Sequence, residues 1–162
     1  MLQERQLSNA PLQLVPRGPV GSAAQLPAPP SADKIEAMPQ VLLVDDEPRV
    51  ARALEFALKG SDFAVTSISD PALLESNLLQ SRPDAVLLDI GIGAEDGLAV
   101  CERIKKDVRF ASIPVLLLSG QTGADTKAAG FAAGADDFIT KPFSPVELIA
   151  RVQAQISRRA SA

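Results

Sequence analysis

Short apolar runs alternate with helical patterns of apolar and polar positions along the chain from Gln40 onward. The apolar runs are typical of buried strands, and the stretches between them have the repeat of amphipathic helices. The predicted strands cover residues 41–44, 63–68, 85–88, 115–118 and 137–139. The predicted helices cover residues 48–58, 71–80, 97–106, 122–133 and 145–157.

This alternation predicts an α/β fold in which helices cover both faces of a parallel sheet. Asp70 and Ser144 stand where helix N-caps are expected, and a proline follows each of them at the first helical position. We therefore expect a (βα)5 fold with a doubly wound, five-stranded parallel sheet of the flavodoxin-like type. Ligands of such sheets bind beyond the carboxyl ends of the strands, so functional residues are expected there.

The first 39 residues differ from the rest of the chain. They are rich in Pro, Gln, Ala and Ser and lack a sustained helical or alternating repeat, which predicts a disordered N-terminal extension. Residues 14–18 resemble a thrombin cleavage site, which leaves the origin of the extension open. One folded domain is expected over residues 40–159, followed by a short tail at 160–162.

Composition excludes several classes of function. With no histidine in the chain, histidine-based zinc sites and Ser-His-Asp triads are excluded. The formal charge of −4 gives no indication of direct nucleic-acid binding. The chain has neither a signal peptide nor the roughly 18 apolar residues of a spanning helix, so we expect a cytoplasmic protein without membrane contact. Cys101, in an apolar stretch, is interpreted as a core residue rather than a reactive thiol.

Polar and reactive side chains follow four of the five predicted strands. Each taken alone has an ordinary explanation, because a carboxylate at such a place can cap the next helix and an isolated lysine is usually solvated. Carboxylates at adjacent strand ends, however, repel one another unless a cation lies among them. The residues concerned are Asp45, Asp46, Glu47, Asp89, Ser119, Thr140 and Lys141.

A hard divalent cation fits this set of groups. Carboxylate and backbone carbonyl oxygens, completed by water, are the ligands that Mg²⁺ prefers next to phosphate. Lys141, which follows an apolar strand and precedes a proline, is expected to point into the cleft. Its charge could pair there with Asp89 or with a phosphoryl oxygen.

Four motifs, in their order along the chain, resemble the receiver domain of response regulators, the CheY-like family of bacterial two-component systems. The resemblance covers about 120 of the 162 residues. Its motifs are VLLVDDE at 41–47, PDAVLLD at 83–89, PVLLLSG at 114–120 and GADDFITKPF at 134–143. Asp96 and Gly97 match the Asp-Gly pair that opens the third helix of the family.

The resemblance implies a phosphoacceptor rather than an enzyme, with at most Mg²⁺-dependent self-phosphorylation and autodephosphorylation. Asp89 would take a phosphoryl group from a kinase phosphohistidine. The metal would be held by Asp46, Asp89 and the backbone carbonyl of Gly91, with Asp45 acting through water. Lys141 would neutralise phosphoryl oxygens.

The output implied by the resemblance is conformational. Ser119 would close onto the phosphoryl group, and Phe138 would then turn inward and repack the face made by the fourth helix, the fifth strand and the fifth helix. Four glycines between residues 120 and 134 suggest a loosely held fourth helix. Gly130 is the glycine least easily explained as a turn or cap.

The implied partners are a sensor histidine kinase or a histidine phosphotransfer protein, and a downstream protein target. A phosphorylation-dependent dimer through the same face is a further expectation. We expect a stand-alone receiver; the alternatives are a receiver-like interaction module that is never phosphorylated, and a receiver fragment of a larger regulator or hybrid kinase.

The chain departs from the common family pattern in the loop after Asp89. Ile92 and Gly93 stand where Met and Pro are common, which suggests a mobile loop. Gly91 and Gln121 occupy the positions that tune dephosphorylation in the family. A magnesium-dependent hydrolase with an aspartyl-phosphate is disfavoured, because Gly91 replaces its second carboxylate. A dinucleotide-binding turn at residues 91–97 is disfavoured by its spacing and its acidic side chains.

Overall fold

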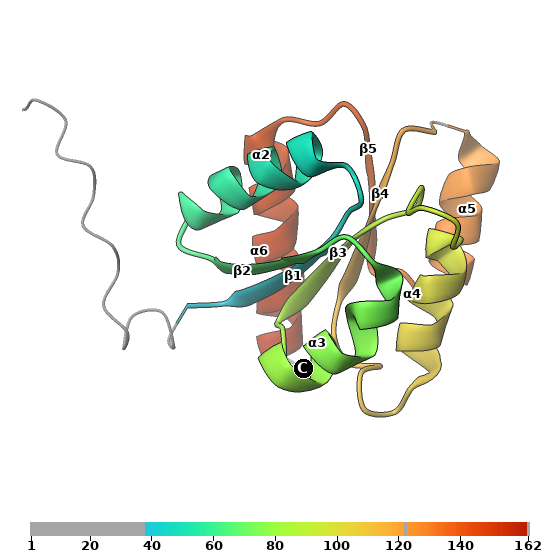
Figure 1. Ribbon diagram of the computed structural model, residues 1–162, viewed down its shortest axis with the longest axis horizontal. Helices are drawn as coiled ribbons and strands as arrows, with labels where there is room; N and C mark the ends of the chain where they lie inside the picture. The colour runs from blue at the N-terminus through green and yellow to red at the C-terminus, as the bar shows by residue number, and fades with distance from the viewer. Residues whose placement is uncertain (1–37, 122, 162) are drawn as a thin grey trace, which may run out of the picture. The chain divides into compact units, whose positions relative to one another are not determined.

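The computed structural model describes residues 38–121 and 123–161 (Figure 1). Five strands alternate with helices: β1 (Gln40–Val44), α2 (Pro48–Lys59), β2 (Ala64–Ile68), η1 (Pro71–Leu73), α3 (Leu74–Ser81), β3 (Ala85–Asp89), α4 (Gly97–Lys106), β4 (Val115–Ser119), α5 (Ala124–Ala132), β5 (Asp137–Thr140) and α6 (Pro145–Ser161). The prediction of disorder for residues 1–39 falls outside the described residues, except for Met38 and Pro39.

The five strands form one parallel sheet in the order β2-β1-β3-β4-β5. The first strand lies inside the sheet, so the chain winds outward from β1 in both directions and the switch point falls between β1 and β3. The prediction of a doubly wound α/β fold is confirmed.

Two hydrophobic clusters cover the two faces of the sheet. On one face, α3 and α4 pack their buried leucine, valine and isoleucine side chains against the even-numbered residues of β1 and β3, such as Leu42 and Leu88. On the other face, α2 and α6 pack against the odd-numbered residues, such as Leu43 and Leu87. Because alternate side chains of a strand point to opposite faces, one strand serves both clusters.

The same alternation sorts the polar residues at the strand ends. Asp89 pairs in register with Leu118, which belongs to the cluster beneath α2 and α6. Ser119 lies one position further on, in step with Leu117 and Phe138, which face the opposite side. The sheet therefore places the residue predicted to carry the phosphoryl group and the residues predicted to switch on different faces.

Three predicted helices differ from the structure in detail. The helix predicted at 71–80 begins with the 3-10 turn η1, where the Asp70 carboxylate accepts the Ala72 N–H at 2.9 Å. Because this tight turn satisfies the first donors, α3 proper starts only at Leu74. The helix predicted at 122–133 is shorter, and Thr122 is outside the described residues. The helix predicted to end at 157 continues to Ser161.

Cys101 is fully buried in α4, which confirms its interpretation as a core residue. Burial raises the pKa of the Cys101 thiol to about 11. The thiol is therefore protonated at neutral pH and is a poor nucleophile.

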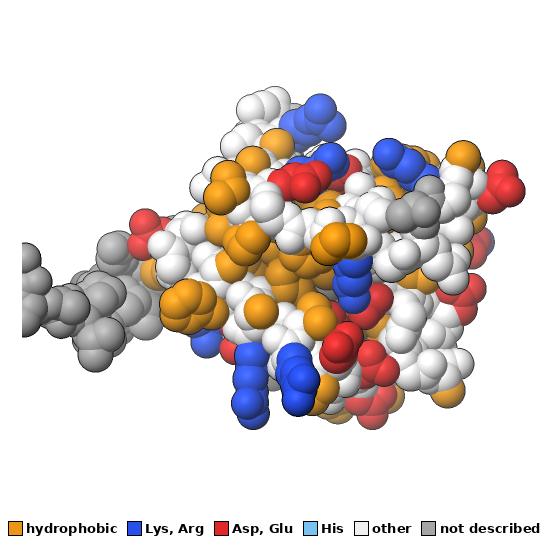
Figure 2. All heavy atoms as spheres, turned by 90° about the horizontal axis from the view of Figure 1, so that it is seen from above, with side chains coloured by type: hydrophobic (Ala, Val, Ile, Leu, Met, Phe, Trp, Pro, Cys, Tyr) orange, Lys and Arg blue, Asp and Glu red, His pale blue; other side chains and the backbone are white. Residues whose placement is uncertain are grey.

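The surface carries charges of both signs. Figure 2 shows one face on which basic and acidic side chains lie among hydrophobic ones, without a continuous basic area. Within residues 38–121 and 123–161, no helix combines the length and the apolar character needed to cross a membrane.

Candidate functional site

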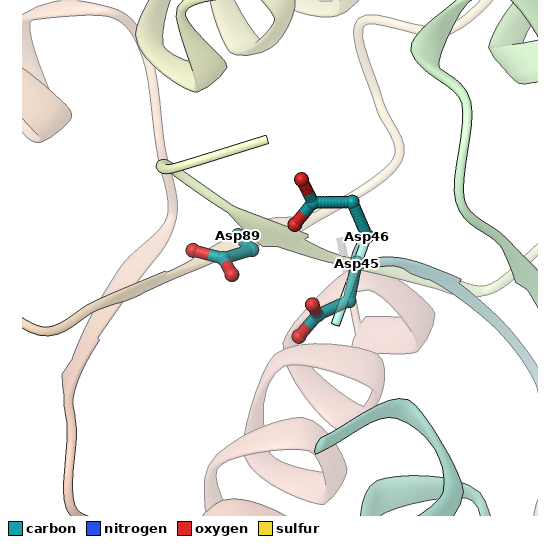
Figure 3. A group of neighbouring side chains, drawn as sticks. All are labelled: Asp45, Asp46 and Asp89. Atoms are coloured by element: carbon teal, nitrogen blue, oxygen red, sulfur yellow. The ribbon is translucent and has the colours of Figure 1, made fainter. Parts of the chain in front are cut away.

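Three carboxylates meet at the carboxyl ends of β1 and β3. Val44 and Leu88 pair in register, so the residues that follow them, Asp45 and Asp89, are neighbours, and Asp46 comes next along the chain. One oxygen of each carboxylate lies within 4.8 Å of the others. Figure 3 shows the three side chains around a common space. The convergence expected from the fold is therefore present in the structure.

Asp45 is the most deeply buried of the three carboxylates, with 2% of its surface exposed against 8% for Asp89, while Asp46 is exposed. Its Oδ1 accepts the Glu47 N–H at 2.8 Å, while its Oδ2 has no hydrogen-bond partner among the described residues. Burial raises the pKa of Asp45, the hydrogen bond from Glu47 opposes this, and the charge of Asp89 adds to the rise. A buried, unpaired carboxylate oxygen beside two other carboxylates is the arrangement that a divalent cation would stabilise.

The donor set fits magnesium. All candidate ligands are oxygens: the chain contains no histidine, and the buried Cys101 is not part of the group, so a softer metal lacks its preferred ligands. These are the three carboxylates for which the resemblance to receiver domains predicts a magnesium site. For the backbone carbonyl of Gly91, its role as a ligand stays a prediction.

Asp46 has a contact that the sequence did not indicate. Its Oδ2 accepts the backbone N–H of Gly93 at 2.8 Å, from the loop that follows β3. Gly93 has a φ of 49°, a left-handed conformation that glycine adopts more readily than other residues. In the same loop Ile92 is fully buried and the Glu95 N–H donates to the Ile92 carbonyl at 3.1 Å. The loop therefore has defined contacts in the structure, whereas Ile92 and Gly93 in place of Met and Pro suggested a mobile loop.

Asp89 is held by one donor at each oxygen. Its Oδ2 accepts from Lys141 Nζ at 3.0 Å, and its Oδ1 accepts the Gly91 N–H at 3.0 Å. Lys141 reaches Asp89 from just beyond β5, across the end of β4. These contacts fix the Asp89 carboxylate at the edge of the three-carboxylate group, next to a positive charge.

Gly97, the first residue of α4, explains how the helix approaches this site. A β carbon at this position would lie 2.5 Å from Ile90 Cα and 2.7 Å from the Asp89 carbonyl oxygen. Only glycine allows α4 to start this close to the backbone at the end of β3. The Gly97 N–H donates to the Ile90 carbonyl at 3.0 Å, and Asp96 caps the helix. The Asp96-Gly97 motif was the sequence signal for this close contact.

Ser119 and Phe138 lie near the site, and the Ser119 hydroxyl forms no hydrogen bond with Asp89 among the described residues. The Ser119 hydroxyl oxygen accepts the Gln121 N–H at 3.0 Å, within the loop after β4. Phe138 is 3% exposed and belongs to the hydrophobic cluster that also contains Leu117. The ring is therefore already buried, whereas the sequence suggested an inward turn only after phosphorylation.

A cavity of about 620 Å³ lies away from these residues, between α3 and α4. It is lined by apolar side chains such as Leu74 and Ile104 and by carboxylates such as Glu75 and Asp107. It shares no residue with the three-carboxylate group. The candidate site therefore lies at the carboxyl ends of β1 and β3 and not in this cavity.

Comparison with known proteins agrees with this geometry. Residues 41–153 match the model of the response regulator receiver domain. The DNA-binding dual master transcriptional regulator RpaA of Synechocystis is 36% identical over 121 residues, which cover 75% of this chain and 50% of RpaA. The transcriptional regulatory protein PrrA of Mycobacterium leprae is 40% identical over 121 residues, 75% of this chain and 51% of PrrA.

A solved structure supports the same fold. The signal receiver domain of a signal transduction histidine kinase from Syntrophus aciditrophicus superimposes with a TM-score of 0.69 and 29% identity, over 74% of this chain and 91% of that domain. The chain thus matches a whole receiver domain, while it spans about half the length of the curated relatives.

Proposed function

The chain belongs to the response regulator receiver family, whose domains are phosphoacceptors rather than enzymes, and on this basis we propose that Asp89 accepts the phosphoryl group. The observation that carries the proposal is the surroundings of Asp89. It is the carboxylate that shares the acidic group with Asp45 and Asp46 and is also bound by Lys141 at 3.0 Å. A nucleophile between a metal site and a fixed cation is suited to phosphoryl transfer.

We propose a role for each of the surrounding residues. Asp46, Asp89 and the Gly91 carbonyl would hold Mg²⁺ directly, with Asp45 acting through water. The bound ion would supply charge neutralisation for the phosphoryl oxygens. Lys141 would leave Asp89 Oδ2, its present partner, for a phosphoryl oxygen, which keeps its ammonium paired. Ser119 would exchange its Gln121 contact for another phosphoryl oxygen.

Phosphorylation would be read by a partner protein through α5, β5 and α6. Receiver domains pair with histidine kinases, so the donor is proposed to be a sensor histidine kinase or a histidine phosphotransfer protein in the cytoplasm. The same face is the proposed site of a phosphorylation-dependent dimer. In this proposal residues 40–159 are the receiver domain, residues 1–39 an extension and residues 160–162 a tail.

The relatives favour one alternative to a stand-alone receiver. RpaA and PrrA are named as transcriptional regulators, and this chain corresponds to about half of each. A receiver that forms part of a longer regulator, or of a hybrid kinase, has the same residues at the site. The assignment of Asp89 is unchanged in either case.

The proposal is tested by phosphorylation with acetyl phosphate and Mg²⁺, followed by mass spectrometry of the intact protein. We expect a gain of one phosphoryl group that is lost in Asp89→Asn and in the presence of a chelator. Asp125→Asn is the matched control, because Asp125 is an exposed carboxylate in the first turn of α5. If a known receiver is modified under these conditions and this chain is not, the receiver-like interaction module is the better account.

A further inference from the structure

Gly130 occupies the place in α5 that faces the Phe138 ring. It is the buried residue of α5 within the described part of the chain. A β carbon built on Gly130 would lie 2.9 Å from Phe138 Cδ2 and 3.1 Å from Leu117 Cδ1. Carbon atoms in proteins do not normally approach each other this closely, so any other residue at position 130 would force the ring or the helix to move.

The absence of a side chain at Gly130 also makes an outward ring unfavourable. If Phe138 turned out, the space between Gly130 and Leu117 would be left with neither a side chain from the helix nor the ring. Empty volume in a packed core lowers stability in proportion to its size. With a larger residue at 130, the same space would stay filled when the ring left. Gly130 therefore favours the inward position of the Phe138 ring in two ways: it leaves room for the ring, and it would leave an empty space if the ring turned out.

The Ser119 hydroxyl, which was expected to move together with the Phe138 ring, has not moved towards Asp89. Ser119 binds the Gln121 backbone at 3.0 Å and not the phosphoacceptor Asp89, while Phe138 is already 3% exposed. If the Phe138 ring could turn inward only after Ser119 had moved, the ring would be exposed while Ser119 contacts Gln121. The two parts of the expected switch are thus separate in this chain.

We propose that Gly130 is a positioning residue that fixes the Phe138 ring inside the core before phosphorylation. The ring then keeps its place when Asp89 is phosphorylated, and the change is carried by the loop from Ser119 to Gln121 and the start of α5. This second statement rests on the proposed function of Asp89. The first statement concerns the unphosphorylated protein and does not.

The proposal predicts an effect opposite in sign to helix propensity. Alanine is a better helix former than glycine, so Gly130→Ala should stabilise α5 if Gly130 faced open space. In the structure the added methyl group meets the ring, so Gly130→Ala should displace Phe138 and lower the urea midpoint. Gly123→Ala controls only for the position of the ring, because a β carbon there meets only Thr126 Oγ1, at 3.8 Å. For stability the control is Ala129→Gly, the reverse change at an exposed position of the same helix, which should lower the urea midpoint through helix propensity alone.

The direct measurement is the nuclear Overhauser effect between the Phe138 ring and the Leu117 methyl groups, with the ring assigned by its loss in Phe138→Leu. We expect a strong effect in the full chain without a phosphoryl donor. It should persist after Mg²⁺ and beryllofluoride, which takes the place of a phosphoryl group, are added. It should be lost in Gly130→Ala and kept in Gly123→Ala.

A double variant keeps the test decisive if Gly130→Ala alone does not fold. In a Phe138→Leu background the clash is relieved, so adding Gly130→Ala should restore folding or raise the urea midpoint. The proposal is overturned if Gly130→Ala keeps the Overhauser effect, or if the ring reaches Leu117 only after beryllofluoride is added. If beryllofluoride does not bind at all, the proposed function fails, while the position of the ring in the free protein is still decided.

Discussion

The helices α4 and α5 are held against the sheet in different ways. α4 buries Gly97, Val100, Cys101 and Ile104, has a side-chain cap from Asp96, and ends with three basic residues that suit a helix C-terminus. α5 buries Gly130, its N-cap is Gly123, and no side chain caps it among the described residues. α4 is held by its own buried side chains, whereas α5 is held by the packing of the Phe138 ring against Gly130.

This difference matches the role proposed for each helix. α4 begins against the backbone of Asp89 and Ile90, so a displacement of the start of α4 would disturb Asp89. α5 follows the loop that contains Ser119, where a change of position is the expected signal. Because α4 buries more side chains than α5, the start of α5 can move while α4 keeps its place beside Asp89.

The largest expected effect that tests this comparison is a pair of truncations. Ile104→Ala in α4 should lower the free energy of unfolding by about 2–5 kcal/mol, because Ile104 is 2% exposed and the site cannot collapse around the missing atoms. Phe131→Ala in α5 should lower it by about 0.5 kcal/mol, because its ring is 44% exposed. Urea unfolding followed by circular dichroism measures both. Equal losses would contradict the difference between the two helices.

A smaller effect on the free energy of unfolding should come from the substitution of Asp45, one of the three carboxylates near the start of α4. Burial raises its pKa above the ordinary value of 3.8, so the folded protein retains a proton at pH values where the unfolded chain has lost it. The stabilising contribution is complete below pH 3.8 and is lost as the pH rises through the folded pKa. Without Mg²⁺ at pH 7, Asp45→Asn should therefore raise the free energy of unfolding by about 1–2 kcal/mol, since it removes a buried unpaired charge.

This advantage of Asp45→Asn should shrink as the pH falls towards 3.8. Unfolding in urea at pH 7 and at pH 4, with a chelator present, measures the difference between the two proteins at each pH. Magnesium should stabilise the wild type more than the variant. An advantage that is independent of pH would show that the charge of Asp45 is not its cause.

The smallest effects should come from the helix caps. Asp96→Ala removes the acceptor of the Leu98 N–H and should cost about 1 kcal/mol. Gly123→Ser gives α5 a capping hydroxyl and should add about 0.3 kcal/mol, because glycine is already a tolerated cap. Thermal unfolding of the two variants beside the wild type measures both. A loss in Gly123→Ser would mean that α5 is not limited by its N-terminus.

The sequence was sufficient for the fold because the pattern of buried strands is local and strong. Leu42 and Leu43, or Leu87 and Leu88, are apolar on both faces, which is diagnostic of an inner parallel strand. The grouping of Asp45, Asp46 and Asp89 followed from the same reasoning, since carboxyl ends of parallel strands share one edge.

Two features of the site could not be predicted from the sequence. The bond from Gly93 to Asp46 joins residues 47 positions apart and depends on the conformation of one loop residue. The buried ring of Phe138 depends on the shape of the facing helix at Gly130, which a list of residue types does not contain. Both are matters of backbone position, whereas composition and periodicity report mainly on burial.

The alternation of side chains along β3, β4 and β5 also has a consequence for how such a molecule can be altered. Asp89 belongs to one side of the sheet, with Leu118 beside it, and Ser119 and Phe138 belong to the other. Selection or engineering could therefore exchange the surface that a partner recognises, residue by residue, while the chemistry stays intact. A single-residue insertion within β5 would instead turn the residues on one side of the insertion to the opposite face of the sheet, and so would disturb the placement of Phe138 relative to Lys141, which follows the strand.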